Sequence, residues 1–406
     1  MIPLTLVLAG SPPPDPGAAT SSDAVEVVGA VDPVDHVTAR AADVVGSGMT
    51  GGFDHMCRLL ESGTVQCWGA NDQGQVGDGT GELQPAPVEV AGGGTYSALA
   101  AGHKRTCALE GGELRCWGME IARAPGQPAG EPSLEPTPVA SERSYASVAV
   151  GNQHACVLTE GGDAYCWGRN HSGELGDGTT EARLEPAAVA GGHSFTTISA
   201  GGDHTCALDG EGRAYCWGSN DFGELGTEES GPSSEPVAVQ GDVRFDEIDT
   251  GLNRTCGLTA NGVVHCWGSN GHGALGDGTD EPRSEPAPVA GDVRFESLAV
   301  GSLHTCGLST DDTAYCWGFN GFGELGDGST DARMEPTPVT GEHAFADLTA
   351  GAYRTCGLTG DGVVHCWGRD PSGAIAGAGV IRITEPTAVA GGDQSEGDAG
   401  EASGAR

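Results

Sequence analysis

Fourteen cysteines recur in pairs, each pair preceded by a histidine or an arginine, and these residues have the types and spacing that could support chemistry. One copy reads His204-Thr205-Cys206 and reaches its second cysteine at Cys216. Imidazole and thiolate groups are good zinc ligands, so a metal site is the first candidate. The histidine position is occupied by His55, His154, His204 and His304, and by Arg105, Arg254 and Arg354 in the other copies. Because a guanidinium does not ligate zinc, a common metal role is disfavoured, and we expect these side chains to donate hydrogen bonds to neighbouring backbone carbonyls.

A disulfide within each copy is the second candidate. Asp209-Gly210-Glu211-Gly212 predicts a hairpin turn near Glu211, and this turn places Cys206 opposite Cys216. Directly opposed residues of antiparallel strands have Cα atoms about 4.5–5.5 Å apart, which is within disulfide range. We therefore expect seven disulfides, with reduced and buried cysteines as the alternative. The expected pairs are Cys57 with Cys67, Cys107 with Cys116, Cys156 with Cys166, Cys206 with Cys216, Cys256 with Cys266, Cys306 with Cys316, and Cys356 with Cys366.

A repeat of 49 or 50 residues organises the chain. Each unit contains four short segments of alternating apolar and polar residues, for example 195–200, 204–208, 214–218 and 235–239, separated by Gly, Asp and Asn. This pattern predicts four antiparallel strands joined by tight turns. Seven such units predict an all-β, seven-bladed β-propeller of four-stranded blades, with a solenoid as the alternative. Each unit is marked by one tryptophan between Cys and Gly: Trp68, Trp117, Trp167, Trp217, Trp267, Trp317 and Trp367.

Composition and the chain ends suggest the domain boundaries. Gly 70 and Pro 23 with only 5% aromatic residues are typical of a turn-rich β protein. We expect residues 1–10 to be the remnant of an export signal, 11–43 a linker or disordered segment, 44–390 the propeller and 391–406 a disordered acidic Gly-rich tail. The last unit is followed by no further strand pattern, so a strand near residues 44–50 is expected to close the ring by sharing one blade between both chain ends.

The repeat resembles a known family. Its pattern is Gly-x-x-(His/Arg)-x-Cys-x-Leu, then Gly-x-x-x-Cys-Trp-Gly-x-Asn-x-x-Gly-x-Leu-Gly-Asp-Gly-Thr, then Pro-x-x-Val, over about residues 44–393. This pattern is similar to the RCC1 repeat in its bacterial form, whereas WD40 blades carry Trp-Asp and kelch blades a different Gly and aromatic pattern. The resemblance implies a seven-bladed propeller. It also suggests guanine-nucleotide exchange on a small GTPase, or an enzyme-inhibitor role like that of a propeller that inhibits β-lactamases.

Charge and the first residues bear on partners and location. The formal net charge is −38, which disfavours nucleic acid and attracts cationic partners or divalent ions. No stretch reaches the roughly 20 apolar residues of a membrane span. The short apolar run 1–10 and the even, regularly spaced cysteines favour a secreted, periplasmic or cell-surface protein.

Candidate binding residues lie where the repeats differ. The Gly-rich loop after Trp-Gly varies among units, and its positions should share one rim of the ring. Aromatic groups at loop tips favour a contact patch, with packing between neighbouring loops as the alternative. Asp78, Asp177, Asp277 and Asp327 in the same loops match no known calcium motif. The candidates are Arg169, His171, Phe222, His272, Phe319, Phe322 and Arg369.

The leading hypothesis is an extracytoplasmic, non-catalytic propeller that binds a protein or glycan through these loops. The sequence contains no Gly-x-Ser-x-Gly elbow, Walker loop or His-Glu-x-x-His motif, and its carboxylates recur in register as structural residues do. We therefore expect no enzyme activity, no cofactor, no bound metal and a monomer, with lyase or hydrolase activity as a minor alternative.

The cysteine analysis generates the first prediction. Protein purified from its native host should contain seven disulfides, because the pairs are local and the chain is expected to be exported. Mass spectrometry after alkylation without reduction measures this directly. Fourteen alkylated cysteines would contradict both the pairing and the compartment.

Overall fold

The computed structural model describes residues 48–120, 131–373, 375 and 381–389, which belong to one compact unit of residues 40–406. The segments 1–10, 11–43 and 391–406 lie outside the described residues, so the expectations about them remain predictions.

Seven four-stranded antiparallel sheets form the fold, and in each sheet the strands follow one another in chain order. Blade 1 contains β1 (Gly48–Gly51), β2 (His55–Leu59), β3 (Val65–Gly69) and β4 (Gln84–Glu89); blade 2 contains β5 (Ala98–Ala101), β6 (Arg105–Glu110), β7 (Glu113–Gly118) and β8 (Ser133–Pro138); blade 3 contains β9 (Ser147–Val150), β10 (His154–Leu158), β11 (Ala164–Gly168) and β12 (Arg183–Ala188); blade 4 contains β13 (Phe195–Ala200), β14 (His204–Asp209), β15 (Ala214–Gly218) and β16 (Ser233–Ala238); blade 5 contains β17 (Glu247–Thr250), β18 (Arg254–Leu258), β19 (Val264–Gly268) and β20 (Arg283–Pro288); blade 6 contains β21 (Phe295–Val300), β22 (His304–Ser309), β23 (Ala314–Gly318) and β24 (Arg333–Pro338); blade 7 contains β25 (Phe345–Ala350), β26 (Arg354–Thr359), β27 (Val364–Arg369) and β28 (Arg382–Ala388). Two 3₁₀ turns, η1 (Ala190–Gly192) and η2 (Gly271–Gly273), are the only helical elements in the described ranges.

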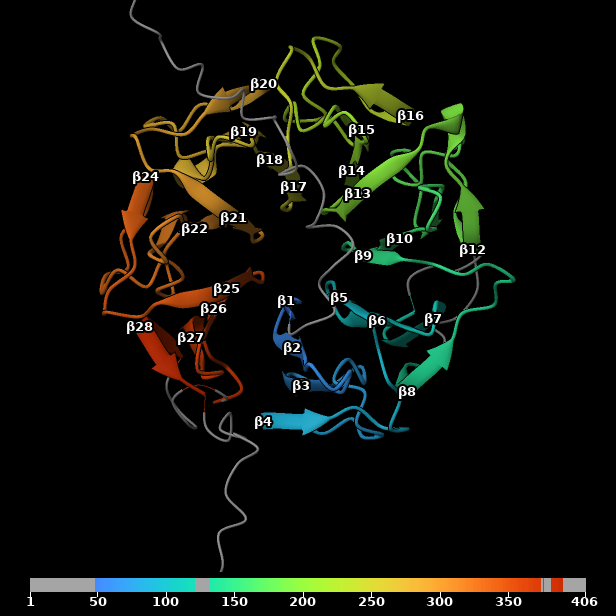
Figure 1. The fold of residues 1–406 in the computed structure, drawn as a ribbon, viewed down its shortest axis with the longest axis horizontal. Helices are drawn as coiled ribbons and strands as arrows, with labels where there is room; N and C mark the ends of the chain where they lie inside the picture. The colour runs from blue at the N-terminus through green and yellow to red at the C-terminus, as the bar shows by residue number, and fades with distance from the viewer. Residues whose placement is uncertain (1–47, 121–130, 374, 376–380, 390–406) are drawn as a thin grey trace, which may run out of the picture. The chain divides into compact units, whose positions relative to one another are not determined.

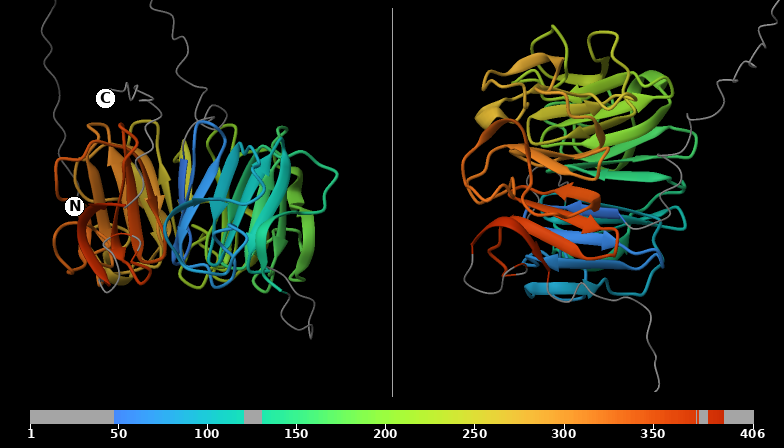
Figure 2. Two further views of the ribbon diagram at one scale, coloured as in Figure 1. Left: turned by 90° about the horizontal axis from the view of Figure 1, so that it is seen from below. Right: turned by 60° about the vertical axis from the view of Figure 1, so that its left-hand side comes forward.

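The sheets are arranged as the blades of a propeller (Figure 1), with the first strand of each blade lining a central channel and the fourth strand outermost. Seen from the side in Figure 2, the strands run between two faces of the ring, and the loops lie at these faces. Because the strands alternate in direction, the first-to-second and third-to-fourth loops share one face, which we call the upper face. The predicted seven-bladed, all-β propeller is confirmed.

Ring closure differs from the expectation. The predicted N-terminal strand is present as β1, but it pairs with β2 inside blade 1, and blade 7 consists of β25 to β28. The expectation that one blade combines both chain ends is therefore wrong, because seven complete units precede residue 390. Contacts between blades 7 and 1 close the ring instead: Met49 N donates to Asp347 Oδ2 at 3.0 Å, and Ala352 N donates to Gly52 O at 3.3 Å.

All seven predicted disulfides are confirmed, and none of the described cysteines is free. Each hairpin places its two cysteines directly opposite each other, as Cys206 and Cys216 are. The Cα atoms of each pair are 4.0–4.1 Å apart, slightly closer than the expected spacing. The bonded pairs are Cys57 with Cys67, Cys107 with Cys116, Cys156 with Cys166, Cys206 with Cys216, Cys256 with Cys266, Cys306 with Cys316, and Cys356 with Cys366.

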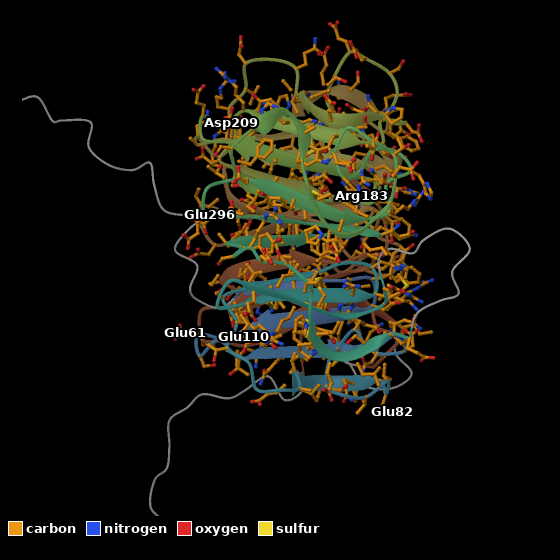
Figure 3. The ribbon with its side chains drawn as sticks, turned by 90° about the vertical axis from the view of Figure 1, so that its right-hand side faces the viewer. Glu61, Glu82, Glu110, Arg183, Asp209 and Glu296 are labelled. Atoms are coloured by element: carbon orange, nitrogen blue, oxygen red, sulfur yellow. A yellow bond between two sulfur atoms is a disulfide. The ribbon has the colours of Figure 1, made fainter. Side chains whose placement is uncertain are left out.

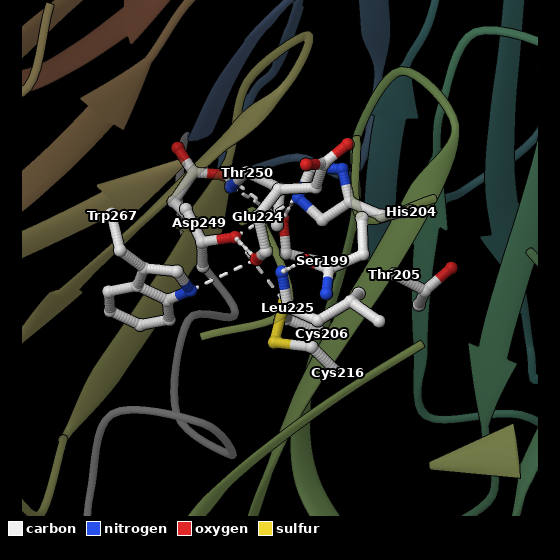
Figure 4. Close-up of a disulfide and its surroundings, with 12 residues drawn as sticks. Ser199, His204, Thr205, Cys206, Cys216, Glu224, Leu225, Asp249, Thr250 and Trp267 are labelled. Carbon is white, nitrogen blue, oxygen red and sulfur yellow. Dashed lines mark hydrogen bonds between the residues drawn. A yellow bond between two sulfur atoms is a disulfide. The ribbon is translucent and has the colours of Figure 1, made fainter. Parts of the chain in front are cut away.

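The core lies between the blades. The cysteines are almost completely buried, and each disulfide packs in one apolar cluster with the tryptophan of the following blade. Figure 4 shows this arrangement for Cys206, Cys216 and Trp267. At the ring closure, Trp68 of blade 1 joins the cluster that contains the disulfide of blade 7.

A ring of seven glycines surrounds the channel at the end of the first strands. A Cβ atom added to Gly201 would lie 2.5 Å from the carbonyl oxygen of Gly251 in the next blade. The same relation passes through all seven blades within 2.6 Å and returns to its start: Gly52, Gly102, Gly151, Gly201, Gly251, Gly301 and Gly351. None of these residues has the left-handed backbone conformation, so the requirement for glycine is steric and comes from the neighbouring blade.

The glycine ring generates the second prediction. Gly201→Ala should lower the free energy of unfolding by about 1–3 kcal/mol, because the methyl group meets a backbone oxygen that cannot rotate away. Gly210→Ala is the matched control, since an added Cβ there meets nothing within 4 Å. Equilibrium urea unfolding under non-reducing conditions measures both variants, and equal stabilities would contradict the steric role of the ring.

Candidate binding site

The loops between the third and fourth strands of blades 3, 4 and 6 are held by buried carboxylates. Glu324 Oε2 accepts a hydrogen bond from the N–H of Phe322 at 2.8 Å, and Glu224 Oε2 accepts one from Phe222 at 2.7 Å. Asn320 supports the same loop, since its Oδ1 accepts the N–H of Leu325 at 3.0 Å. These bonds fix the loop backbone, so the variable side chain at the tip is presented at the upper face.

Three of the predicted residues come together there. His272 of blade 5 contacts Phe319 of blade 6 edge to face, with ring centroids 5.1 Å apart, and Phe319 lies 6.4 Å from Phe322. The series continues through Tyr353 of blade 7, whose ring is 5.7 Å from that of Phe322. Two further rings extend it into blades 1 and 2, where Phe53 lies 5.5 Å from Tyr353 and 4.8 Å from His103. We call His272, Phe319, Phe322, Tyr353, Phe53 and His103 the aromatic arc.

Half of this arc is absent from the residues predicted from the sequence. Phe53, His103 and Tyr353 lie in the loops between the first and second strands, within the Gly-x-x-(His/Arg) part of the repeat. These loops vary between units as much as the Trp-Gly loops do, so the same comparison of repeats carries a signal for them. Their contact with Phe319 and Phe322 depends on the packing of one blade against the next, which no local pattern shows.

Of the four remaining candidates, only Arg369 lies beside the arc. Arg169 Nη1 is 3.1 Å from Asp203 Oδ1 in blade 4, and Arg369 Nη1 is 2.8 Å from Asp54 Oδ1 in blade 1. Both arginines therefore join adjacent blades, although Arg369 also lies over the rings of Phe322 and Tyr353 at 5.8 Å. Phe222 is 46% exposed, and His171 is also exposed; both lie in blades that the arc does not reach.

The arc borders the mouth of the central channel. A cavity of about 470 Å³ is lined by the first strands of all seven blades, and Phe53, His103 and Tyr353 also line it. Most of the other lining residues are small, as Ala101 and Ala200 are, and the mouth also includes Leu252, which is 37% exposed. The upper face thus combines an aromatic surface with an opening that can receive a protruding group.

The four histidines considered as metal ligands form hydrogen bonds between neighbouring blades. His204 Nε2 lies 3.0 Å from Thr255 Oγ1 of the next blade, and this hydroxyl donates to Glu224 O at 2.9 Å. The histidine must therefore be the donor, and Trp267 Nε1 donates to the same carbonyl at 2.9 Å (Figure 4). His55, His154 and His304 reach a threonine in the same way at 2.8–2.9 Å.

The expected hydrogen bond to a carbonyl holds for the arginines and not for the histidines. Arg105 Nη1 donates to Met119 O at 2.8 Å, and Arg254 Nη1 donates to Ser302 O at 3.0 Å. A threonine hydroxyl separates each histidine from the carbonyl, because imidazole is shorter than the arginine side chain. Burial lowers the pKa of His204 to about 3 and that of His154 to about 4, so both are neutral at physiological pH.

The repeated aspartates of these loops are engaged within the protein. Asp177 Oδ2 is 2.7 Å from Arg183 Nε, and its Oδ1 accepts the N–H of Thr179 at 3.0 Å. Among the residues that the structure describes, no group of three or more His, Cys, Asp or Glu is placed to hold a metal ion. No helix of this described part is long and apolar enough to cross a membrane.

The fold and the site define a seven-bladed propeller with an aromatic surface on one face. Its neighbouring blades are joined by histidine hydrogen bonds and by the packing of each disulfide against the tryptophan of the next blade. The chain belongs to the family described as the RCC1-like domain, whose model matches residues 22–345 and 131–402. Among curated proteins, no sequence relative is found.

Several solved structures have a similar fold. Human WBSCR16 is 19% identical with a TM-score of 0.68, over 75% of this chain and 84% of that chain. Prp20p from Saccharomyces cerevisiae is 23% identical with a TM-score of 0.66, over 75% and 80% of the two chains. The ectodomain of the Physcomitrella patens receptor kinase CR4 is 23% identical with a TM-score of 0.54, over 80% and 73%.

The buried hydrogen bond of His204 leads to the third prediction. The imidazole of His204 binds a proton below pH 6.5 in the unfolded chain, but only below about pH 3 in the folded chain. Acid therefore destabilises the fold. His204→Gln removes this titration. Between pH 6.5 and 4.5 the variant should therefore lose about 2–3 kcal/mol less of its free energy of unfolding than the wild type. The exposed His171→Gln is the control, and identical pH profiles for His204→Gln and the wild type in urea unfolding would contradict the assignment.

Proposed function

We propose that this protein is a non-catalytic binding propeller that acts outside the cytoplasm and recognises a protein partner through the aromatic arc. The observation that carries the proposal is the convergence of six aromatic or imidazole rings from five blades at the mouth of the channel. Five of the six rings are partly buried, and His272 is exposed.

The chemistry of the arc favours a protein ligand. Aromatic residues and arginine are enriched in the energetic centres of protein interfaces, because they bury a large area with few rotatable bonds. Tyr353 adds a hydroxyl group, and Arg369 lies over two of the rings. The exposed Leu252 extends the apolar surface across the channel mouth. A glycan could stack on the same rings, and the experiment below separates the two ligand classes.

Seven buried disulfides support a location outside the cytoplasm, because reducing compartments keep such thiols free. The ectodomain of CR4 has a similar fold, which supports the idea that this architecture serves extracellular recognition.

Nucleotide exchange on a GTPase is the second candidate. It rests on the likeness to Prp20p, which has been examined for binding to Gsp1p and histones. The two chains are 23% identical, and this likeness supports a shared fold alone. The arc itself does not depend on this analogy, since it arises from departures from the repeat in this chain.

The fourth prediction tests the arc. Phe319→Ala combined with Phe322→Ala should reduce capture of the partner from the extracellular fraction by at least tenfold, because two rings at the centre of the surface are removed. Phe222→Ala is the matched control, since Phe222 occupies the loop position of Phe322 in blade 4, away from the arc. Quantitative mass spectrometry of the captured proteins, with periodate-treated and untreated extracts, measures binding and separates glycan from protein.

Unfolding midpoints accompany this measurement. A double variant that binds normally but loses several kcal/mol of stability would show that the rings serve packing alone. Capture of a GTPase whose nucleotide release is accelerated would favour the exchange function instead.

A further inference from the structure

A buried carboxylate lies under the aromatic arc without a counter-charge from its own blade. Glu324 has 0% of its surface exposed, and its Oε2 accepts the N–H of Phe322. Its other oxygen, Oε1, has no hydrogen-bond partner among the described residues. Burial raises the pKa of Glu324 to about 7, because the ionised carboxylate is removed from water.

The equivalent carboxylates of other blades show what is missing. In blade 4, Glu224 Oε1 accepts a hydrogen bond from the hydroxyl of Ser219 at 2.8 Å. In blade 3, Glu174 Oε1 also makes no hydrogen bond, but the guanidinium of Arg169 lies 3.8 Å from it, within ion-pair distance, and pairs with Asp203 of the next blade. This second arrangement shows that the position accommodates an arginine head group close to the buried oxygen.

Aromatic rings occupy the two positions near Glu324 that correspond to Arg169 and Asp203. Phe319 stands where blade 3 has Arg169, and Tyr353 of the following blade stands where blade 4 has Asp203. The centroids of the two rings are 6.3 Å apart. The faces of aromatic rings attract cations, and guanidinium groups are common partners of such faces. The site therefore combines an unpaired carboxylate with rings suited to a cation.

The nearby arginines do not fill this place. Arg369 is engaged with Asp54 through both carboxylate oxygens, at 2.8 and 3.2 Å. Arg382 is exposed on the outermost strand β28 and lies over the ring of Phe322 at 5.9 Å, where its charge favours the ionised form of Glu324.

We propose that Glu324, which holds the loop that carries Phe319 and Phe322, is the anchoring site for an arginine side chain supplied by the protein partner. The guanidinium would take the place that Arg169 occupies in blade 3, and the phenyl ring of Phe319 would move aside to admit it. The inference rests on the proposed function for the source of the arginine, whereas the site itself can be tested without a partner.

The charge of the whole molecule supports a basic partner. The net charge of −38 attracts cations over a distance of about one Debye length, and exposed carboxylates lie on the loops of the upper face. Figure 3 shows Glu82 on this face and Glu61 on the opposite face. The exposed carboxylates of the third-to-fourth loops in the blades that form the arc include Glu82, Asp280 and Asp331.

The fifth prediction uses methylguanidinium as the probe and the full, oxidised chain. Titration calorimetry should detect one site in the wild type that is at least tenfold weaker in Glu324→Gln. The substitution keeps the loop, because blade 1 already has glutamine here, and Gln75 Oε1 accepts the N–H of Gln73 at 2.8 Å. Glu224→Gln is the matched control and should bind the probe as the wild type does, since the hydroxyl of Ser219 already occupies that oxygen.

The pH dependence adds a second readout. Because the probe binds the ionised carboxylate, its affinity should rise about tenfold between pH 6 and pH 8 in the wild type, as a carboxyl with a pKa of about 7 loses its proton. Glu324→Gln should show no such rise. Carbon-13 NMR of the glutamate carboxylates, assigned with the same variant, follows the ionisation directly.

A third variant supplies the cation within the chain. Phe319→Arg should reproduce the arrangement of Arg169, lower the pKa of Glu324 and abolish binding of the probe. Equal binding by the wild type and Glu324→Gln would overturn the proposal. Binding that appears only in Arg382→Ala would also overturn it, because Arg382 would then be the counter-charge. Probe binding without any captured partner would leave the site intact and contradict only the proposed function.

Discussion

The close approach of neighbouring blades at the glycine ring is the constraint on which the rest of the structure depends. Each first strand is followed by a glycine at which an added Cβ would meet the carbonyl oxygen of the next glycine, and the series closes from Gly351 to Gly52. At this spacing Met49 N donates a hydrogen bond to Asp347 Oδ2, and the loops of adjacent blades come into contact at the upper face. Ring closure therefore needs no blade shared between the chain ends, because the interface between blades 7 and 1 uses the same kinds of contact as the others. The first and last blades are far apart in the chain and still share one apolar cluster.

A second set of contacts converges on a single carbonyl in the third-to-fourth loops of blades 3, 4 and 6. Glu224 O accepts hydrogen bonds from Thr255 and Trp267 of the next blade, and His204 reaches the same threonine. Four residues from two blades thus satisfy one another in a buried place, where an unpaired polar group would destabilise the fold. The pattern also bears on the exchange of histidine and arginine between units. Each of the four histidines bonds a threonine of the next blade, whereas the position equivalent to that threonine is Ala155 in the blade after Arg105 and Met56 in the blade after Arg354. Where the hydroxyl is missing, the longer side chain finds another acceptor, as Arg354 does at Arg369 O. Arg254 combines both arrangements, since it donates to Thr305 Oγ1 as well as to backbone carbonyls.

The candidate site arises where this regular system is broken. An ion pair joins the loops of blades 3 and 4 through Arg169 and Asp203, and aromatic rings replace both partners between blades 6 and 7. This replacement exposes apolar surface. It also leaves Glu324 without the arginine that lies beside Glu174 in blade 3. A repeat protein can accept such a change locally, since each blade contacts only its neighbours. The departures lie in consecutive blades, so they accumulate into one surface instead of scattering around the ring.

The sequence by itself determined the number of blades, the four strands of each and the pairing of the cysteines. These features are local: a turn of a few residues sets the register of Cys206 against Cys216, and alternation of apolar residues marks the strands. It also identified His272, Phe319 and Phe322 as unusual, because they depart from the repeat. Only the tertiary structure decided that Tyr353 and Phe53 join them, that Arg369 pairs with Asp54, and that the buried histidines bond a threonine. These contacts cross from one blade to the next, where the spacing is set by packing and ring closure and leaves no periodic trace in the chain.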